Sequence, residues 1–307
     1  MARRKKGRPV DGWIVIDKPK GVGSTQVVSK VRWAFHAQKA GHSGTLDPMA
    51  TGALAVALGE ATKTVPYAVD GEKAYRFTVR WGAATDTDDA DGEAIASSDA
   101  RPTTEAIDQA LPAFVGEILQ RPPAYSAIKV DGQRAYDLAR DGEAPELAPR
   151  PIWVESLNRV GEPTADACEF EMVCGKGGYV RSVARDLGEA LGCLGHVTAL
   201  RRLRTGPFDL AHAFPFEKLD ALREEDAAEK HLLPVSAGLD DIPALQLDPG
   251  RAAQVRQGRA VPAVGLTLTY GDLAWASCDG APVAVGVVKA GDFHPSRVFN
   301  IAGDARV

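Results

Sequence analysis

The chain has 307 residues, a formal net charge of −5 and 25% charged residues, which is an ordinary composition for a globular protein. This length exceeds that of one typical domain and predicts one large and one small domain. The longest apolar runs, such as residues 53–58, are far shorter than the roughly 18 residues that span a bilayer, which argues against an integral membrane protein.

The first ten residues form a basic tail, and the apolar stretch 13–16 that follows is too short for a secretory signal. The four cysteines, at positions 168, 174, 193 and 278, show no CxxC pairing and no histidine at ligand spacing, so a structural zinc site is not expected. These features predict a cytoplasmic protein with reduced thiols. The basic residues of the tail are Arg3, Arg4, Lys5, Lys6 and Arg8.

The net charge by itself argues against a nucleic-acid partner, because phosphate binding depends on cationic contacts. The distribution of charge weakens that argument. Acidic residues concentrate in 86–93 and 217–229, whereas arginines lie at 181, 185, 201, 202 and 204 and in the tail. A basic face on an acidic protein would suit RNA.

Residues 12–17 are apolar and β-branched, and they predict a short buried strand that ends at Lys18. A glycine-rich turn follows, in which Ser24 is expected to cap a helix that begins near Thr25. The turn lacks the spacing of a dinucleotide-binding or phosphate-binding loop. The helix is indicated by apolar residues at helical spacing, namely Val27, Val28, Val31, Ala34 and Phe35.

The loop at 41–52 carries one carboxylate, Asp47, among several turn-forming residues. Three glycines and Pro48 within twelve residues exclude a helix or a regular strand interior. In this context Asp47 fits a turn-capping residue ahead of Pro48. A loop tied to the buried run 53–58 can also direct one side chain at a substrate, so both interpretations stay open from composition alone.

Residues 73–81 form the clearest predicted strand, with Tyr75, Phe77, Val79 and Trp81 on one face. On this pattern Tyr75 is a core or rim aromatic residue. The acidic run 85–93 follows. In an EF-hand register this run would need a bidentate glutamate where Ser98 stands, so no metal is assigned to it.

Farther along, the sequence predicts a capped helix at 103–114, a strand at 168–174 and a further helix that begins near Val180. Arg181, at the start of that helix, would ordinarily be a solvated charge. Leu200 is expected to lie in the hydrophobic core. The adjacent Arg201 and Arg202 indicate a strand edge that faces an anion.

Seven segments resemble motifs of the TruB family of tRNA pseudouridine synthases, and GHSGTLDPMATG is the most specific match. The sequence departs from the family at Gly178, where the family has threonine. The segments are DKPKGVGS at 17–24, GHSGTLDPMATG at 41–52 with LGEATK at 58–63, KAYRF at 73–77, TDTDDADG at 85–92, PPAYSAIK at 122–129, KGGYVRS at 176–182 and GHVTALRRLRTG at 195–206.

The resemblance implies the α+β pseudouridine synthase fold, with a central mixed, mostly antiparallel sheet flanked by helices and loops and a small C-terminal β-rich, PUA-like domain. The expected division is a basic flexible tail at 1–10, a catalytic domain at 11–240 and a PUA-like RNA-binding domain at 241–307. An RNA-clamping insertion is expected at about 125–151, where basic and aromatic residues suit phosphate contact and stacking.

The resemblance also implies the site. Asp47 would be the catalytic nucleophile, Arg181 would pair with it, and Tyr75 would stack on the target base and take part in proton transfer. His42, Tyr75, Tyr179, Leu200 and Lys18 would bind the substrate. No metal and no cofactor are expected.

The implied function is the isomerisation of uridine 55 in the T loop of tRNA by a monomer without a membrane or an obligatory protein partner. The main alternative is a tRNA-binding or folding protein with minor or vestigial synthase activity, against which the intact Asp47, Tyr75 and Arg181 count. A guide-RNA-dependent relative is disfavoured by the presence of segment 125–151. A nucleoside or glycoside hydrolase would need a second positioned carboxylate, which the matched segments do not supply.

Overall fold

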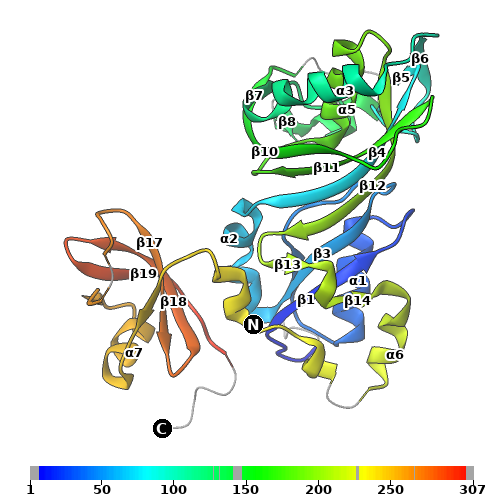
Figure 1. The fold of residues 1–307 in the computed structure, drawn as a ribbon. Coiled ribbons are helices and arrows are strands. Elements are labelled where there is room, and N and C mark those ends of the chain that lie inside the picture. Colours follow the sequence, from blue (N-terminus) through cyan, green and yellow to red (C-terminus); the bar gives the residue numbers. More distant parts are fainter. Residues whose placement is uncertain are drawn as a thin grey trace. The chain divides into compact units, whose positions relative to one another are not determined.

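The computed structural model describes residues 7–126, 128–130, 132–140, 147–225, 228–265 and 267–301, without the side chains of residues 134, 137 and 140 (Figure 1). Residues 1–6 of the predicted tail and residues 127, 131 and 141–146 of the predicted insertion lie outside this description. The chain folds as two compact units. The first consists of Met1–Asp47, Ala53–Gly71 and Thr205–Val307, and the second of Pro48–Gly52 and Glu72–Arg204.

The N-terminal part of the first unit is a small mixed sheet. Strand β1 (Gly12–Lys18) pairs in parallel with β14 (Ala213–Pro215), and β3 (Thr51–Leu58), whose first two residues belong to the second unit, lies on the other side of β1. Strand β2 (Ala40–His42) pairs antiparallel with β3. Both β1 and β3 are buried almost throughout, as their nearly continuous apolar sequences require.

Helix α1 (Ser24–Ala34) packs through Val27, Val31 and Ala34, as its apolar spacing predicts. The predicted cap is wrong by one residue, because Gly23 is the N-cap and Ser24 lies in the first turn. The hydroxyl of Ser24 is instead bonded to the backbone of Leu46. The other helices of this part are α2 (Val65–Asp70), α6 (Leu219–Arg223) and the 3-10 helices Gly59–Lys63, Leu210–His212, Phe216–Lys218, Ala228–His231 and Val235–Leu239.

The C-terminal part of the first unit is β-rich, as predicted. Its five strands pair in the order β15-β17-β18-β19-β16, and helix α7 (Pro249–Arg256) packs against them. Val285 and Phe299 join a buried cluster with Trp13, so this sheet shares a core with the N-terminal part of its unit. The strands are β15 (Ala244–Gln246), β16 (Val261–Pro262), β17 (Leu273–Cys278), β18 (Ala281–Lys289) and β19 (Asp292–Val298).

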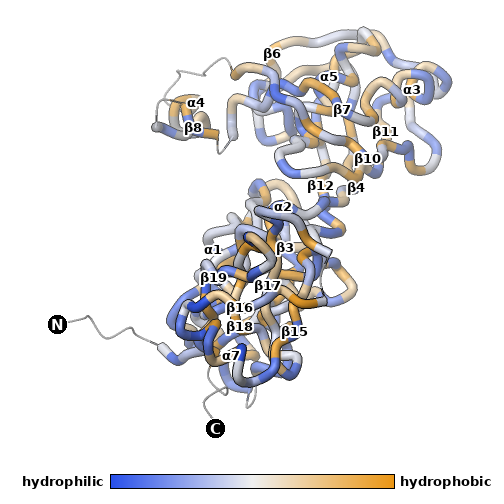
Figure 2. Tube along the Cα trace, turned by 90° about the vertical axis from the view of Figure 1, so that its left-hand side faces the viewer, coloured by the Kyte–Doolittle hydropathy of each residue, from blue (hydrophilic) through white to orange (hydrophobic). Residues whose placement is uncertain are grey.

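The second unit is built on an antiparallel ladder of β4 (Lys73–Trp81), β11 (Ala167–Cys174), β10 (Arg150–Val160) and β7 (Gly116–Gln120). Hydrophilic and hydrophobic residues alternate along β10 and β11 (Figure 2). Helices α3 (Thr104–Ala110) and α5 (Val180–Ala190) lie over one face of this sheet (Figure 1). The remaining elements are β5 (Ala83–Thr85), β6 (Ala94–Ser97), the 3-10 helix Leu111–Phe114, β8 (Lys129–Val130), β9 (Gln133–Arg134), α4 (Ala135–Arg140) and β12 (Gly195–Thr205).

The covered face of the ladder carries the side chains that the alternation of β4 predicts. Tyr75, Phe77, Val79 and Trp81 are all buried, and the ring centroids of Phe77 and Phe170 lie 5.6 Å apart. The predicted α+β class with a mixed, mostly antiparallel sheet and a β-rich C-terminal part is confirmed. Among the described residues, no helix is both long enough and apolar enough to cross a membrane.

The expectation that Arg201 and Arg202 mark a strand edge is wrong. Strand β12 pairs in parallel with the start of β3, through Arg201 opposite Thr51 and Arg202 opposite Gly52, and β4 lies on its other side. Arg202 is therefore internal, with 1% of its surface exposed.

Gly52 allows the backbones of β3 and β12 to approach each other. A Cβ atom at this position would lie 2.2 Å from the carbonyl oxygen of Arg202, and the φ angle of Gly52 is +102°. We therefore expect Gly52→Ala to lower the free energy of unfolding by more than about 2 kcal/mol, measured by urea titration with circular dichroism.

The matched control is Gly116→Ala in β7, where φ is also positive (+89°) but nothing lies within 4 Å of the added Cβ. Only backbone strain of about 1 to 2 kcal/mol is expected there. Equal losses in the two variants would contradict the role of the close approach.

Candidate active site

The loop that carries Asp47 connects β2 to β3. Its part up to Asp47 belongs to the first unit, and hydrogen bonds hold the backbone of this part. The Ser43 amide donates to the Ala55 carbonyl oxygen at 3.0 Å. The amide of Leu46 donates to the Ser24 hydroxyl at 2.8 Å, and that hydroxyl donates to the Leu46 carbonyl oxygen at 2.9 Å. Asp47 follows directly and is half-buried. The loop is therefore held on the side from which the chain enters Asp47.

His42 ends β2 in the same unit and is half-buried. The amide of Gly44 donates to its Nδ1 atom at 3.2 Å. Because this bond uses the lone pair of Nδ1, a neutral ring carries its proton on Nε2 and can donate there.

Lys18 ends β1 and is completely buried, with 0% of its surface exposed. Its ammonium group donates to the carbonyl oxygens of Pro19 at 3.0 Å and Val22 at 2.7 Å. These bonds hold the glycine-rich turn that leads into α1. They satisfy part of the hydrogen-bonding requirement of a charge that would be costly to bury alone.

The other predicted site residues belong to the second unit. Tyr75 lies on β4 opposite Met172 of β11, and Leu200 lies buried on β12. The Leu200 carbonyl oxygen accepts a bond of 3.3 Å from the hydroxyl of Thr51. Both predicted strand positions are therefore as expected, whereas the substrate-binding roles stay predictions.

Tyr179 is the N-cap of α5, and its backbone is held by one side chain. The Tyr179 amide donates to Oε1 of Gln120 at 2.9 Å, and Nε2 of Gln120 donates to the Tyr179 carbonyl oxygen at 3.0 Å. Gln120 ends β7 and is 2% exposed. The sequence gives no local signal for this contact, because the two residues are 59 positions apart.

Arg181 lies in the first turn of α5 and is 4% exposed, so the expectation of a solvated charge from its position alone fails. Nη1 donates to the carbonyl oxygen of Thr87 at 2.9 Å, and Nη2 donates to that of Tyr125 at 2.8 Å. The carboxylate of Asp89 lies 3.7 Å from Nε. These three groups fix the plane of the guanidinium group within its own unit.

The acidic run 85–93 is the support for Arg181 that the sequence does not reveal. Asp89 is buried, and its Oδ1 atom accepts bonds from the Thr87 hydroxyl at 2.6 Å and from the Asp91 amide at 3.0 Å. The run is joined to β12 through the Ala90 amide, which donates to the Val197 carbonyl oxygen at 2.9 Å. In the described part of the chain, no group of three His, Cys, Asp or Glu side chains is arranged to hold a metal ion.

Asp88, in the same run, has a left-handed backbone with φ of 60° and pairs with Arg185 of α5 at 2.9 Å. Burial raises the pKa of Asp88 to about 6, against the lowering effects of Arg185 and Arg181. The run thus contacts α5 at two arginines one helical turn apart.

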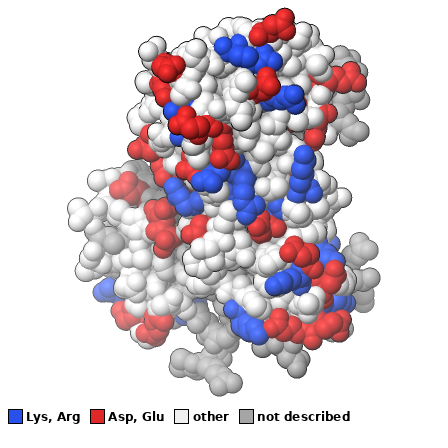
Figure 3. All heavy atoms as spheres, turned by 45° about the vertical axis from the view of Figure 1, so that its right-hand side comes forward, with Lys and Arg blue, Asp and Glu red and all other residues white. Residues whose placement is uncertain are grey.

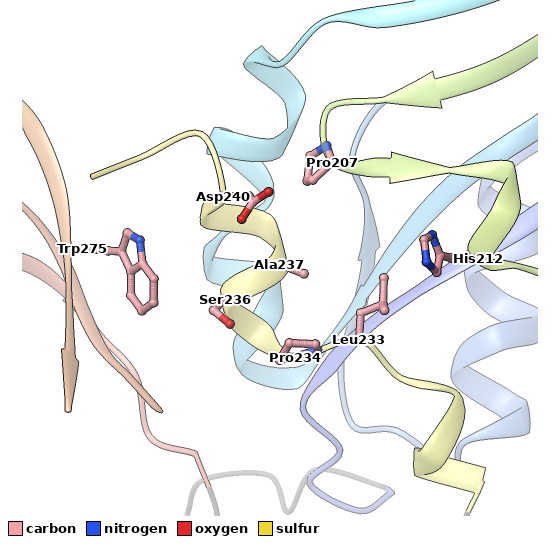
Figure 4. Close-up of a pocket in the computed structure, with 8 residues that line it drawn as sticks. All are labelled: Pro207, His212, Leu233, Pro234, Ser236, Ala237, Asp240 and Trp275. Carbon is pink, nitrogen blue, oxygen red and sulfur yellow. The ribbon is translucent and has the colours of Figure 1, made fainter. Parts of the chain in front are cut away.

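A pocket of about 340 Å³ lies in the first unit (Figure 4). Trp275 of β17 lies on one side of it, and most of the other lining residues belong to segment 233–240. None of the predicted site residues lines it. Its lining residues are Pro207, His212, Leu233, Pro234, Ser236, Ala237, Asp240 and Trp275. On the face drawn in Figure 3, cationic and anionic side chains are interspersed, so neither sign of charge dominates it.

Two family descriptions match the chain. Residues 32–180 match the TruB family pseudouridylate synthase (N terminal domain), and residues 181–240 match the tRNA pseudouridylate synthase B C-terminal domain. A tRNA pseudouridine synthase B of Cereibacter sphaeroides is 59% identical over 301 residues, covering 98% of this chain and 100% of that protein. The chain belongs to the TruB family. This TruB-family enzyme is a tRNA pseudouridine synthase, an isomerase.

Further relatives with the same name, from a Ruegeria species and from Brucella melitensis, are 58% and 47% identical, covering 98% and 97% of this chain and 99% of each relative. Among solved structures, a chain of a Cbf5-Nop10-Gar1 complex has a TM-score of 0.75 at 25% identity, covering 98% of this chain and 91% of its own. The predicted pseudouridine synthase fold of the TruB-family chain is thereby confirmed.

The raised pKa of Asp88 predicts a specific pH dependence of stability. The unfolded carboxyl titrates near its ordinary value of about 3.9, so the folded state binds more protons between that value and about 6. The stability contributed by this group is therefore highest at low pH and falls as pH rises through the interval, by at most about 3 kcal/mol. Urea unfolding at pH 4.5 and 7 should show this loss in the wild type and not in Asp88→Asn.

Asparagine tolerates the left-handed backbone, so the variant should keep the local fold. The exposed Asp220→Asn variant serves as the control and should keep the wild-type pH dependence. The same slope in Asp88→Asn as in the wild type would contradict the assignment.

Proposed function

We propose that the enzyme isomerises uridine 55 in the T loop of tRNA, with Asp47 as the nucleophile on a flipped-out nucleotide. We also propose that the enzyme acts in the cytoplasm as a monomer, and that it needs no metal, cofactor or obligatory protein partner. Family membership supports the reaction class, and the motif at 41–52 supports Asp47. The structural observation that carries the proposal is the hydrogen-bonded backbone immediately before Asp47, which restricts where its carboxylate can lie.

The reaction rearranges one bond and conserves all atoms of the nucleotide except for exchange of a proton. The bond from C1′ to N1 breaks and a bond from C1′ to C5 forms. C5 loses its proton, and N1 ends with one. No oxidant or reductant is needed, and a carboxylate can attack carbon or stabilise positive charge at C1′. Attack of Asp47 at C1′, attack at C6 and formation of a glycal all satisfy this balance.

Arg181 is proposed to pair with Asp47 and to orient its carboxylate for the reaction. Its bonds to Thr87 and Tyr125 support this role, since a guanidinium group that is already fixed loses little freedom when a carboxylate pairs with it. Tyr75 is proposed to stack on the uracil and to take part in proton transfer. A base inside a stack is sterically blocked, so the nucleotide must leave its loop.

The remaining predicted residues are proposed to bind the substrate. His42, Tyr179 and Leu200 would contact the reacting nucleotide. Lys18 would act through the turn before α1 that its buried ammonium group holds. Segment 125–151 and the domain at 241–307 are proposed to bind the RNA outside the reacting nucleotide.

Asp47→Asn should abolish product formation while tRNA binding is retained. The substitution keeps the shape of the side chain and removes its charge and nucleophilicity. We expect the single-turnover rate to fall by at least about 10⁴-fold and the Kd for tRNA to change by less than about threefold. The rate is measured with tRNA transcript in excess enzyme, and binding by filter retention.

The exposed Asp220→Asn variant controls for loss of one negative charge and should match the wild type. Product formation by Asp47→Asn at the wild-type rate would contradict the nucleophile assignment. A wild type that binds tRNA tightly and makes no product would favour the tRNA-folding alternative.

Arg181→Lys should slow the reaction although the charge is kept, because lysine lacks the planar fork that contacts two carbonyl groups at once. We expect a fall of about 10² in the single-turnover rate. Arg76→Lys is the control, since Arg76 pairs with Glu171 on the exposed face of β4. An unchanged rate in Arg181→Lys would refute the proposed ion pair.

A further inference from the structure

Two segments of the proposed site are held in the same way, each by one buried side chain that forms two hydrogen bonds to a single backbone residue. Ser24 holds Leu46, directly before Asp47, and Gln120 holds Tyr179, two residues before Arg181. We propose that Ser24 and Gln120 are positioning residues for the isomerisation. This inference rests on the proposed roles of Asp47, Tyr179 and Arg181.

The bonds of Ser24 reach the nucleophile through the geometry of the peptide group. The carbonyl group of Leu46 and the amide of Asp47 share one rigid plane, which ends at the Cα atom of Asp47. The Ser24 hydroxyl donates to that carbonyl oxygen at 2.9 Å and accepts from the Leu46 amide, in the preceding plane, at 2.8 Å. Two consecutive peptide planes are thus tied to one oxygen atom, and the direction in which the Asp47 side chain leaves the backbone is restricted.

Ser24 can serve as an anchor because its own position is fixed. It is 5% exposed and stands in the first turn of α1, whose Val27 and Val31 are fully buried. The turn before it is held by the ammonium group of Lys18, which binds the Pro19 and Val22 carbonyl oxygens. The hydroxyl does not cap α1, so it contributes to the loop rather than to its own helix.

Gln120 acts at the start of α5 in the second unit. Its amide side chain occupies both the N–H and the C=O group of Tyr179, and thereby fixes the peptide planes on each side of that residue. Backbone carbonyl oxygens of the same segment accept three further hydrogen bonds from α5, one of them from Arg185 to Arg121 at 2.8 Å. The Arg121 carbonyl oxygen accepts from the Ser182 hydroxyl at 2.7 Å, and that of Tyr125 accepts from Arg181 at 2.8 Å. Gln120 is the one member of this set that acts through its side chain, so it can be changed without altering the backbone chemistry.

A positioning role is distinguishable from plain stabilisation, because the chain contains a matched contact elsewhere. The hydroxyl of Thr164 donates to the Ala167 carbonyl oxygen at 3.2 Å and accepts from the Ala167 amide at 3.0 Å. This is the same two-bond contact in an exposed turn before β11, next to none of the proposed site residues in the sequence. Thr164→Ala therefore removes equivalent bonds without affecting the backbone of a site residue.

The experiment measures tritium release from a tRNA transcript that carries [5-³H]uridine, under single-turnover conditions with the full chain. The reaction removes the proton from C5 of the target uridine, so release reports the isomerisation directly. We expect Ser24→Ala and Gln120→Met to slow release by about 10-fold to 100-fold, since a displacement of about 1 Å at a reacting group can cost that much. The Kd of Ser24→Ala for tRNA should stay within about threefold of the wild type.

Thr164→Ala should release tritium at the wild-type rate, and Ser24→Thr, which keeps the hydroxyl, should recover most of the rate lost in Ser24→Ala. Thermal unfolding and tRNA binding of each variant establish that folded enzyme is compared. Ser24→Ala and Gln120→Met enzymes that bind tRNA and react at the wild-type rate would overturn the inference, and so would an equal loss of rate in Thr164→Ala. After either of these outcomes the proposed function would still stand, provided that the wild type releases tritium and Asp47→Asn does not. A wild type that releases no tritium would overturn the proposed function and this inference together.

Discussion

Burial of the Arg181 guanidinium group is the constraint on which the second unit depends. A charge with 4% of its surface exposed must be surrounded by oxygen atoms, and two of them are backbone carbonyls from segments far apart in the sequence. The acidic run 85–93 and the segment after β7 must therefore both reach the first turn of α5. Their own hydrogen bonds, through Asp89 and Gln120, hold them there. The geometry around one cation thus determines the path of two loops.

In the first unit, hydrogen bonds likewise satisfy the buried charge of Lys18 and hold the backbone of the Asp47 loop. The buried ammonium group binds two carbonyl oxygens of the turn before α1, and Ser24 then fixes the backbone at Leu46. In both units, side chains within the family-like motifs bind main-chain groups. The presence of Lys18 and Ser24 in the motif at 17–24 is thereby explained by the need to hold a loop.

The strands and long helices could be predicted because their apolar residues repeat with a regular period. The burial of Tyr75 and Phe77 and the packing of α1 follow from that period alone. Contacts that depend on the tertiary path could not be predicted. Ser24 was expected to cap α1, but its hydroxyl binds Leu46, 22 residues away, and the internal position of Arg202 depends on pairing between β12 and the start of β3. The resemblance to the TruB family supplied Asp47 and Arg181 as candidates, whereas Gln120 carried no sequence signal.

The most direct test of the proposed function is the position of the product in tRNA. An unmodified tRNA transcript is incubated with the protein, with no metal or cofactor added for the enzyme, and pseudouridine is mapped by carbodiimide-blocked reverse transcription. The proposed function predicts a single stop that marks position 55 in the T loop and that is absent when Asp47→Asn is used. A stop at another position, or tight binding with no stop, would contradict it.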